Sequence, residues 1–353
     1  ASLAQAALTA RVELRPDLTL SAQANADADH DFGRRVDLVE AFMRYRPALS
    51  DRAGLDIRAG LFFPPVSLEN TERGWLSPYA STFSAINAWI GEEVRTLGIE
   101  AGPTLRLGSA EVRAFGAVSR RNDPSGTLLA WRGFALHDRV SGLGDRLPLP
   151  SLRSFARPDL FPDQARFVEP VREVDGRWSW SLGASLIHPE GRVRAYYQPP
   201  TADPGSFDGE QYAWRTSFAA LGAARTFGPV EVVAQGLDGE TRMGRLRDGR
   251  NAIVAGFRAG FLLASWTSPA SRHRATLRFD AFRVTDEDSF RTEDANSETG
   301  NAWLLAYRLR PAERHAFTLE FLRVDSRRDN RRDLGLDDRA IEFLASLSWK
   351  VSF

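Results

Sequence analysis

The sequence contains no cysteine, a single lysine and no long apolar run. Without cysteine the chain has no disulfides, no thiolate metal site and no cysteine nucleophile. A helical membrane span needs about 18 or more consecutive apolar residues, so a helical membrane protein is also excluded. The formal net charge is +0, which leaves neither the basic footprint of a nucleic-acid-binding protein nor an acidic tail.

Arginine supplies nearly all of the positive charge. Of the 46 basic residues, only Lys350 is lysine. A GC-rich coding genome is one cause of such a bias. Arginine also stays charged and presents a planar fork to carboxylates and phosphates, so the positions of the arginines carry information about function.

The last stretch of the chain alternates strictly between apolar and polar residues. Ile341, Phe343, Ala345, Leu347, Trp349, Val351 and Phe353 share one face of a predicted strand, and Glu342, Ser346, Ser348, Lys350 and Ser352 share the other. A strand of about 9 to 11 residues crosses a bilayer at the tilt of a barrel. This ending resembles the terminal strand of outer-membrane β-barrels, which implies that Trp349, Val351 and Phe353 form an assembly signal. The last strand of a soluble β-sandwich would alternate in the same way.

The same alternation recurs along the chain and predicts which residues face lipid. Leu55 to Leu61, Trp178 to Leu186, Leu277 with Phe279, and Trp303 to Leu309 each alternate with polar or charged residues. We assign two further strands in this way. In the first, Trp214 and Phe218 face lipid and Arg215 faces inward. In the second, the odd-numbered residues from Ile253 to Leu263 face lipid and Arg258 faces inward.

Connections alternate in length, which separates a membrane barrel from a sandwich. Short turns near 15, 47, 108, 189, 228, 269 and 311 interleave with long polar loops near 30, 64, 122, 199, 240, 290 and 330. Outer-membrane barrels have short periplasmic turns and longer outer loops. We therefore predict an all-β fold in which residues 1–353 form one transmembrane antiparallel β-barrel.

About fifteen strands can be read directly, but single-chain bacterial barrels have an even number. We favour sixteen. Three readings remain open: a strand precedes Ala1, the segment 122–176 hides one, or the first segment is not in the wall.

Two long segments interrupt the strands. In residues 64–93, Pro64, Pro65 and Pro78 prevent continuous pairing and the run from Thr82 to Trp89 favours a short helix. We predict that this loop folds inward and that Glu69, Asn70, Arg73, Glu92 and Glu93 lie at the constriction. Residues 122–176 are predicted to be a long extracellular loop, with weak strand patterns at 128–136 and 167–174.

Residues 34 to 118 resemble the phosphate-selective porin family. The similarity lies in Pro-Pro-Val-Ser-Leu-Glu-Asn at 64–70 and Gly-Glu-Glu-Val-Arg-Thr-Leu-Gly at 91–98, which flank the third loop in that family. Pro65-Val66 stands where an aromatic residue is usual, and lysines are missing from the mouth. The resemblance implies a barrel with an inward-folded loop and phosphate or polyphosphate as solute.

The inward face of a large barrel sets which solutes pass. Ten arginines are assigned inward against seven carboxylates: the arginines are Arg44, Arg46, Arg58, Arg95, Arg113, Arg194, Arg215, Arg258, Arg278 and Arg308. We expect a passive diffusion channel for small hydrophilic solutes, with a preference for anions and with no metal or cofactor. The alternative is that these groups form salt bridges between wall and loop.

Two other functions are weighed against the channel. A barrel that serves as a scaffold in an envelope complex has no sequence signature. A hydrolase needs a nucleophile oriented by histidine, and none of the five histidines is predicted to lie inward beside a serine, so we expect no enzyme.

The predicted location is the bacterial outer membrane of a Gram-negative cell. The expected partners are outer-membrane lipid, lipopolysaccharide and the barrel-assembly machinery, together with a homotrimer or an envelope protein complex. Nucleic acid is not expected as a partner.

Overall fold

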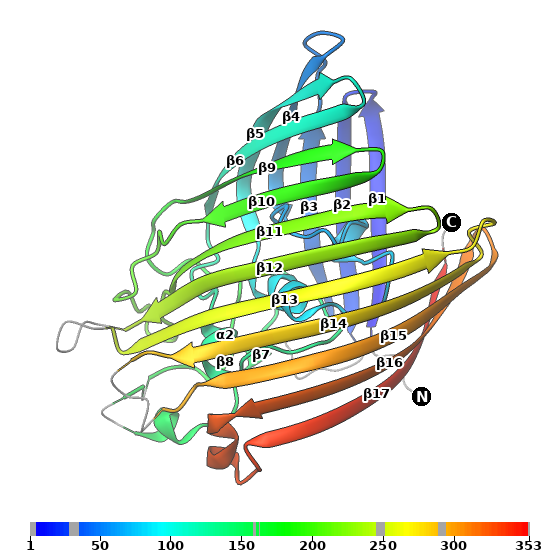
Figure 1. Ribbon diagram of the computed structural model, residues 1–353. Helices are drawn as coiled ribbons and strands as arrows, with labels where there is room; N and C mark the ends of the chain where they lie inside the picture. Colours follow the sequence, from blue (N-terminus) through cyan, green and yellow to red (C-terminus); the bar gives the residue numbers. More distant parts are fainter. Residues whose placement is uncertain are drawn as a thin grey trace.

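The computed structural model describes residues 5–27, 35–157, 160–161, 163–244, 251–288 and 294–351. Fifteen strands of this part form one antiparallel sheet, which confirms the predicted all-β class. Figure 1 shows the sheet curving so that its first strands (blue) face its middle strands across an interior occupied by loops. The described residues thus contain one wall strand fewer than the sixteen that we favoured.

The wall strands are β1 (Gln5–Arg15), β2 (Leu18–Asp27), β3 (Val36–Tyr45), β4 (Ala53–Phe62), β5 (Thr96–Leu107), β6 (Ala110–Arg120), β9 (Ser179–His188), β10 (Gly191–Gln198), β11 (Arg215–Phe227), β12 (Val230–Met243), β13 (Ile253–Thr267), β14 (His273–Asp286), β15 (Glu298–Ala312), β16 (His315–Arg328) and β17 (Arg339–Val351). A separate two-stranded sheet pairs β7 (Leu147–Pro148) with β8 (Phe167–Val168). The helices are α1 (Ala85–Glu93), α2 (Thr127–Trp131) and the 3-10 turns η1 (Arg73–Trp75), η2 (Arg153–Ala156) and η3 (Asp329–Leu334).

Each wall strand is hydrogen-bonded to the next wall strand along the chain, so the sheet is a continuous meander. The connections at one end are short, as between β11 and β12, and those at the other end include the long segments 63–95 and 121–178. Consecutive short and long connections therefore lie at opposite ends of the sheet. Among the described residues, no helix is long and apolar enough to cross a membrane.

The segment 122–176 adds no strand to the wall in its described residues. The run that begins at Leu128, for which a weak strand pattern was noted, forms helix α2 because its backbone hydrogen bonds close locally, as from Arg132 to Leu128. Residues 167 and 168 do form a strand, but it pairs only with β7. The first strand, β1, belongs to the wall through its pairing with β2.

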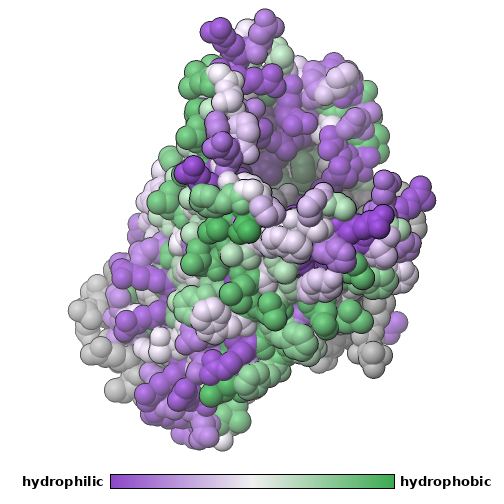
Figure 2. Space-filling view, turned by 45° about the vertical axis from the view of Figure 1, so that its right-hand side comes forward, coloured by the Kyte–Doolittle hydropathy of each residue, from purple (hydrophilic) through white to green (hydrophobic). Residues whose placement is uncertain are grey.

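Large apolar side chains cover the outer face of the wall. On β13 to β17 they include Leu262, Leu277, Trp303, Leu305, Phe321 and Leu347, all exposed. Figure 2 shows one face on which hydrophobic surface (green) lies between hydrophilic surfaces (purple). Trp266, Tyr307 and Trp349 lie toward the short-turn end, where an aromatic girdle belongs in a transmembrane barrel.

Of the three residues predicted as the assembly signal, two lie in the described part of the chain. Trp349 is exposed on β17 and its ring stacks against that of Phe317, with centroids 6.1 Å apart. Val351 ends β17 opposite His315. Phe353 lies outside the described residues.

Strands β11 and β13 have the opposite orientation to the one predicted. Phe218 and Phe257 are buried inside, whereas Arg215 and Arg258 are exposed on the outer face. Both faces of β13 carry apolar residues, as Leu262 shows on the outside and Leu263 on the inside. Alternation tells which residues share a face, but it does not tell which of two apolar faces meets lipid.

This orientation can be tested by truncating neighbouring side chains. Phe257→Ala removes a ring that packs inside the barrel and should lower the free energy of unfolding by about 3–5 kcal/mol. Arg258→Ala changes an exposed outer position and should stay within about 0.5 kcal/mol of the parent protein. Urea titration of the protein in detergent measures both, and equal effects would contradict the orientation.

Candidate functional site

The segment 63–95 lies inside the barrel. Pro64 and Pro65 cannot donate hydrogen bonds to a ladder, so β4 ends at Phe62 and the chain leaves the wall. Every residue of α1 is buried. The Trp89 ring packs against Phe218 and Phe257 on the inner faces of β11 and β13, with both centroid distances 5.2 Å. This segment therefore fills part of the lumen.

Two acceptors fix the start of α1. The Ser84 hydroxyl accepts the N–H of Asn87, as an N-cap does. From the wall, Asp280 Oδ1 accepts the N–H of Ala85 at 3.1 Å. A carboxylate at this position also stabilises the positive end of the helix dipole. The inner face of β14 thus positions the helix of the loop.

Arg278 joins the wall to the loop through a completely buried ionic cluster. Its guanidinium donates to Asp280 at 2.8 Å on the same strand and forms an ion pair with Glu69 in the loop. It also donates to the carbonyl oxygens of Thr82 and Phe83 at 2.8 and 2.9 Å. Arg278 is therefore inward, as predicted from the sequence, but it holds the loop in place and does not face an open lumen.

Arg95 performs a similar task at the other end of the loop. Its guanidinium donates to the carbonyl oxygens of Gly91 at 2.9 Å and Ser141 at 2.6 Å. It lies 3.5 Å above the ring of Phe63. The prediction that Arg95 lines the pore is wrong, because these contacts bury it between α1, the segment 122–176 and the wall.

The segment 122–176 packs on α1 through buried carboxylates. Glu93 accepts the N–H groups of Leu128 at 2.8 Å and Gly126 at 3.1 Å, and the indole N–H of Trp89 at 2.7 Å. Burial raises the pKa of Glu93 to about 7 despite these donors. Glu93 therefore joins the two segments through hydrogen bonds and does not line a constriction.

The neighbouring carboxylate, Glu92, is also buried. It pairs with Arg132 and lies 3.0 Å from His137 Nε2. Burial alone would raise its pKa, but these two groups hold the pKa of Glu92 below its ordinary value. The ion pairs attach the long insert to the end of α1.

A polar cavity of about 340 Å³ remains between the loop and the strands β1 to β6, β9 and β10. Three wall ion pairs line or adjoin it. Arg44 donates to Asp56 at 2.7 Å, Arg58 donates to Glu100 at 2.8 Å, and Arg113 pairs with Glu111. Water and small polar solutes fit this part of the lumen, in contrast to the apolar part covered by Trp89.

Cations outnumber carboxylates around this cavity. Five arginines (Arg44, Arg58, Arg73, Arg113 and Arg194) and four carboxylates (Glu40, Asp56, Glu72 and Glu100) line it. Arg194 donates to the hydroxyl of Ser185 at 3.0 Å and the carbonyl of Ser67 at 2.6 Å. Within the described chain, neither Arg194 nor the exposed Arg73 forms an ion pair with a carboxylate. Two guanidinium groups are thus available to solutes in the cavity.

The predicted site residues divide into four groups. Arg44, Arg58, Arg113, Asn70 and Arg73 surround the polar cavity. Glu69, Glu92, Glu93, Arg95, Arg278 and Arg308 are buried and hold segments together. Arg46 is exposed beside a short turn, and Arg215 and Arg258 lie on the outer face. Arg308 belongs to the second group because it donates to the carbonyl oxygen of Pro78 at 2.6 Å.

Sequence reasoning missed two anchors of the loop. Tyr79 donates to Glu231 at 2.9 Å and accepts from Arg192 at 2.9 Å, while Lys350 pairs with Glu72 at 2.5 Å. Arg192 shares its face of β10 with Arg194, which was predicted inward, and Lys350 lies on the predicted polar face of the last strand, while Glu231 lies on the inward face of β12. The alternation along each strand could therefore have identified these three residues as inward, but no sequence pattern indicated which loop residues they contact.

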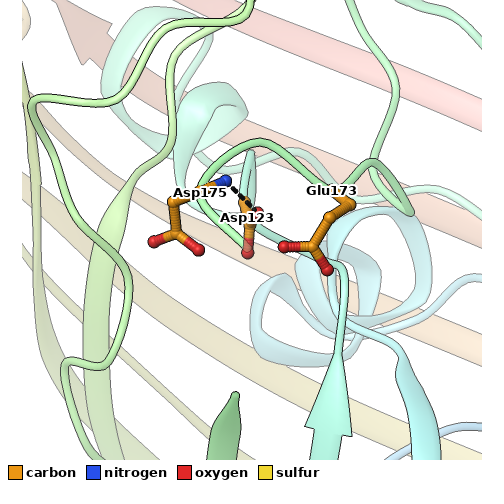
Figure 3. A group of neighbouring side chains, drawn as sticks. All are labelled: Asp123, Glu173 and Asp175. Carbon is orange, nitrogen blue, oxygen red and sulfur yellow. Dashed lines mark hydrogen bonds between the residues drawn. The ribbon is translucent and has the colours of Figure 1, made fainter. Parts of the chain in front are cut away.

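Three carboxylates gather beyond β6, with their oxygens within 4.8 Å of one another: Asp123, Glu173 and Asp175 (Figure 3). Each accepts backbone N–H groups. Asp123 accepts from Val174 at 2.5 Å and Asp175 at 3.2 Å, Glu173 accepts from Gly176 at 2.8 Å, and Asp175 accepts from Arg177 at 2.8 Å. These bonds give the cluster a structural role in shaping the insert, and it carries no metal assignment.

One side-chain contact between a serine and a histidine occurs in the described chain, between an exposed turn and the exposed end of β9, at the short-turn end. Ser109 Oγ lies 3.0 Å from His188 Nε2, and His188 Nδ1 accepts the N–H of Glu190 at 3.3 Å. Because Nδ1 is an acceptor, the proton of the neutral ring lies on Nε2 and is donated to the serine. The ring is then in the wrong tautomer to activate Ser109 as a nucleophile.

No protein-family model and no curated protein matches this chain. Several solved structures do. A loop-deletion mutant of OmpT, an outer membrane protein of Vibrio cholerae, matches at 9% identity, with 98% of this chain and 90% of that chain covered and a TM-score of 0.48. OccK8 (OprE) of Pseudomonas aeruginosa matches at 10% identity, with 94% and 78% covered and a TM-score of 0.47. A mutant of the Rh. blastica porin matches at 12% identity, with 98% and 89% covered and a TM-score of 0.41.

Arg278→Met tests the buried cluster. Glu69 and Asp280 would stay buried without their counter-charge, and breaking a buried ion pair in this way costs about 3–5 kcal/mol. We expect that loss in urea unfolding. Arg310→Met, at an exposed position on β15, is the matched control and should have little effect. A loss of similar size in both variants would argue against an anchoring role for Arg278.

The raised pKa of Glu93 predicts a pH dependence of stability. The folded state binds a proton at Glu93 with a pKa of about 7, whereas the pKa of the unfolded side chain has its ordinary value of 4.5. The folded protein therefore binds more protons between these values, and its free energy of unfolding should fall as pH rises from about 4.5 to about 7. Glu93→Gln should flatten this slope, and Glu190→Gln in an exposed turn should keep it. An unchanged slope in Glu93→Gln would exclude Glu93 as the source.

Proposed function

We propose that the chain is an outer-membrane channel for passive diffusion of small hydrophilic solutes, with a preference for anions. The observation that carries the proposal is the polar cavity inside a sheet whose outer face is apolar. An apolar outer face suits lipid, and an antiparallel wall satisfies its backbone hydrogen bonds without water. Solutes would pass beside β1 to β6, where charged and polar side chains line the cavity together with Phe42 and Phe115.

The anion preference rests on the two guanidinium groups without a carboxylate partner. Arg194 approaches the cavity from the wall and Arg73 from the loop. A guanidinium cannot be deprotonated at working pH, so the preference should hold over a broad pH range. Arg44, Arg58 and Arg113 contribute less, because nearby carboxylates offset their charge.

Oxyanions are the solutes that this cavity suits best. Arginine binds phosphate and carboxylate through two parallel N–H donors. Phosphate as the solute, which the resemblance to phosphate-selective porins implies, stays a proposal. Because Arg44, Arg58 and Arg113 are already paired with carboxylates, we propose that an oxyanion binds weakly and passes through.

Neither alternative function gains support from a specific contact. The Ser109 and His188 pair has the wrong tautomer for catalysis, so we propose that the protein is not a hydrolase. A scaffold role needs an outer partner, for which lipopolysaccharide, the assembly machinery and a homotrimer remain candidates. A polar cavity is unnecessary for a scaffold and required for a channel.

The selectivity can be tested by replacing the two guanidinium groups together. Arg73→Gln with Arg194→Gln should reduce the anion-to-cation permeability ratio, read from reversal potentials across a KCl gradient. Salt screens charges over about 10 Å at 0.1 M and about 3 Å at 1 M, so the parent preference should fade at high salt.

The control is Arg225→Gln with Arg46→Gln, two exposed arginines that do not line the cavity. This variant removes the same charge and should keep the parent ratio. A cation preference of the parent channel at low salt would contradict the proposal.

A further inference from the structure

A charged hollow interrupts the outer face of the wall. It has a volume of about 690 Å³ and lies over β11 to β14. Its lining includes the small residues Ser217, Ala219, Gly239 and Gly256 and the aromatic residues Tyr197, Phe218 and Phe257. Charged residues surround them: Asp238, Glu240, Arg258, Arg283 and Glu287. A lipid-facing wall has no need for such a feature, so the hollow calls for a polar occupant.

The strand register brings like charges together around this hollow. Arg258 lies directly opposite Arg283 across β13 and β14, and Arg215 lies opposite Arg242 across β11 and β12. Like charges in directly opposed positions destabilise a sheet. An anion between the guanidinium groups would remove this repulsion.

Intramolecular pairing neutralises only half of these arginines. Arg258 pairs with Asp238, and Arg242 pairs with Glu240 at 2.5 Å. Within the described chain, Arg283 and Arg215 form no ion pair. Glu287 also lines the hollow without an ion pair in the described chain. Counting all of these groups, four arginines face three carboxylates, so this part of the outer face carries an excess of one positive charge.

The apolar surface begins directly beside the hollow, toward the short-turn end. In the register of β12, β13 and β14, Asp238, Arg258 and Arg283 share one level, and Gly236, Gly260 and Ala281 lie two residues nearer the short turns. The next level contains Leu262 opposite Phe279. A charge on the lipid face costs about 2–4 kcal/mol at the bilayer midplane and about 0–1 kcal/mol near the interface. The charged level thus suits the headgroup region on the long-loop side.

We propose that this hollow binds the phosphate group of a lipid in the outer leaflet. Arg258 and Arg283 would hold the phosphate between their guanidinium forks, and Leu262 and Phe279 would contact the acyl chains. Asp238 orients Arg258 through their ion pair. The inference rests on the proposed membrane orientation, and it adds a lipid site that is separate from the channel.

The test measures how much phosphorylated lipid the intact protein retains. The full chain in dodecyl maltoside is mixed with bis-phosphorylated lipid A, and bound lipid is counted by native mass spectrometry. Arg258→Gln with Arg283→Gln should reduce retained lipid about tenfold or more, as expected for losing charge-assisted hydrogen bonds. Arg225→Gln with Arg46→Gln removes the same charge at the short-turn end and should retain lipid like the parent.

Further arms identify the ligand. Dephosphorylated lipid A should bind the parent protein as weakly as the phosphorylated form binds the double variant. Inorganic phosphate should not displace the lipid, because it lacks acyl chains. Equal retention by the parent and the double variant would overturn the proposal, as would displacement by inorganic phosphate alone. A changed oligomer mass with unchanged lipid retention would identify the hollow as a contact between copies.

Separate measurements keep this result distinct from the channel. The heat-modifiable electrophoretic mobility of the double variant shows whether it is folded. Its reversal potential should equal that of the parent, since the hollow lies outside the lumen. Loss of lipid with normal selectivity supports both inferences, while normal lipid binding with no conductance would overturn the channel and leave the lipid site standing.

Discussion

The apolar inner faces of β11 and β13 must be shielded from water, and the rest of the structure depends on this requirement. The contact of Trp89 with Phe218 and Phe257 provides the shielding. Strands β11 and β13 carry apolar residues on both faces, so lipid can cover only one of them. The inner face must be covered from within, because exposing it to lumen water would forfeit about 25 cal/mol per Å² of apolar area. Helix α1 supplies that cover, and α2 then packs on α1 through Glu93. The loop is thus part of the hydrophobic core.

Covering one side of the lumen decides where solutes can pass. Arg278 and Asp280 hold the loop against β14, and Arg308 and Lys350 extend these contacts toward β17. The opposite strands, β3 to β6 with β9 and β10, present charged residues together with Phe42 and Phe115, and a cavity remains there. A fixed loop also fixes the distance between Arg73 and Arg194. The selectivity that we propose and the stability of the fold therefore depend on the same buried ion pairs, which is why loosening the anchors should affect both.

The sequence predicts the wall better than the interior. Alternation places Trp303 and Arg308 on the correct faces of β15, because lipid on one side and polar contacts on the other impose different chemistry. It fails for Phe257 and Arg258, since both faces of β13 are apolar and the outer one carries a charged hollow. Alternation also breaks within β3, where Val39 is buried: the pairing of β2 with β3 shifts between Gln23 and Ala24, and a shift of one residue exchanges the faces. Burial of Arg95 and Glu93 follows from contacts between distant segments, which no local pattern encodes.

Because the chain has only one lysine, arginine side chains serve several roles, and the surroundings of each arginine determine its role. Arg278 is fully buried, and two carboxylates with two carbonyl oxygens satisfy its donors, so it binds loop to wall. Arg194 has only neutral acceptors and keeps its charge available to a solute. Arg283 lies opposite Arg258 on the outer wall, where we propose that a lipid phosphate binds both guanidinium groups. The ion pairs that each arginine forms therefore separate the three roles. Two ion pairs make Arg278 an anchor, whereas Arg194 and Arg283 form none in the described chain, which suits the selective charge and the lipid phosphate site that we propose for them.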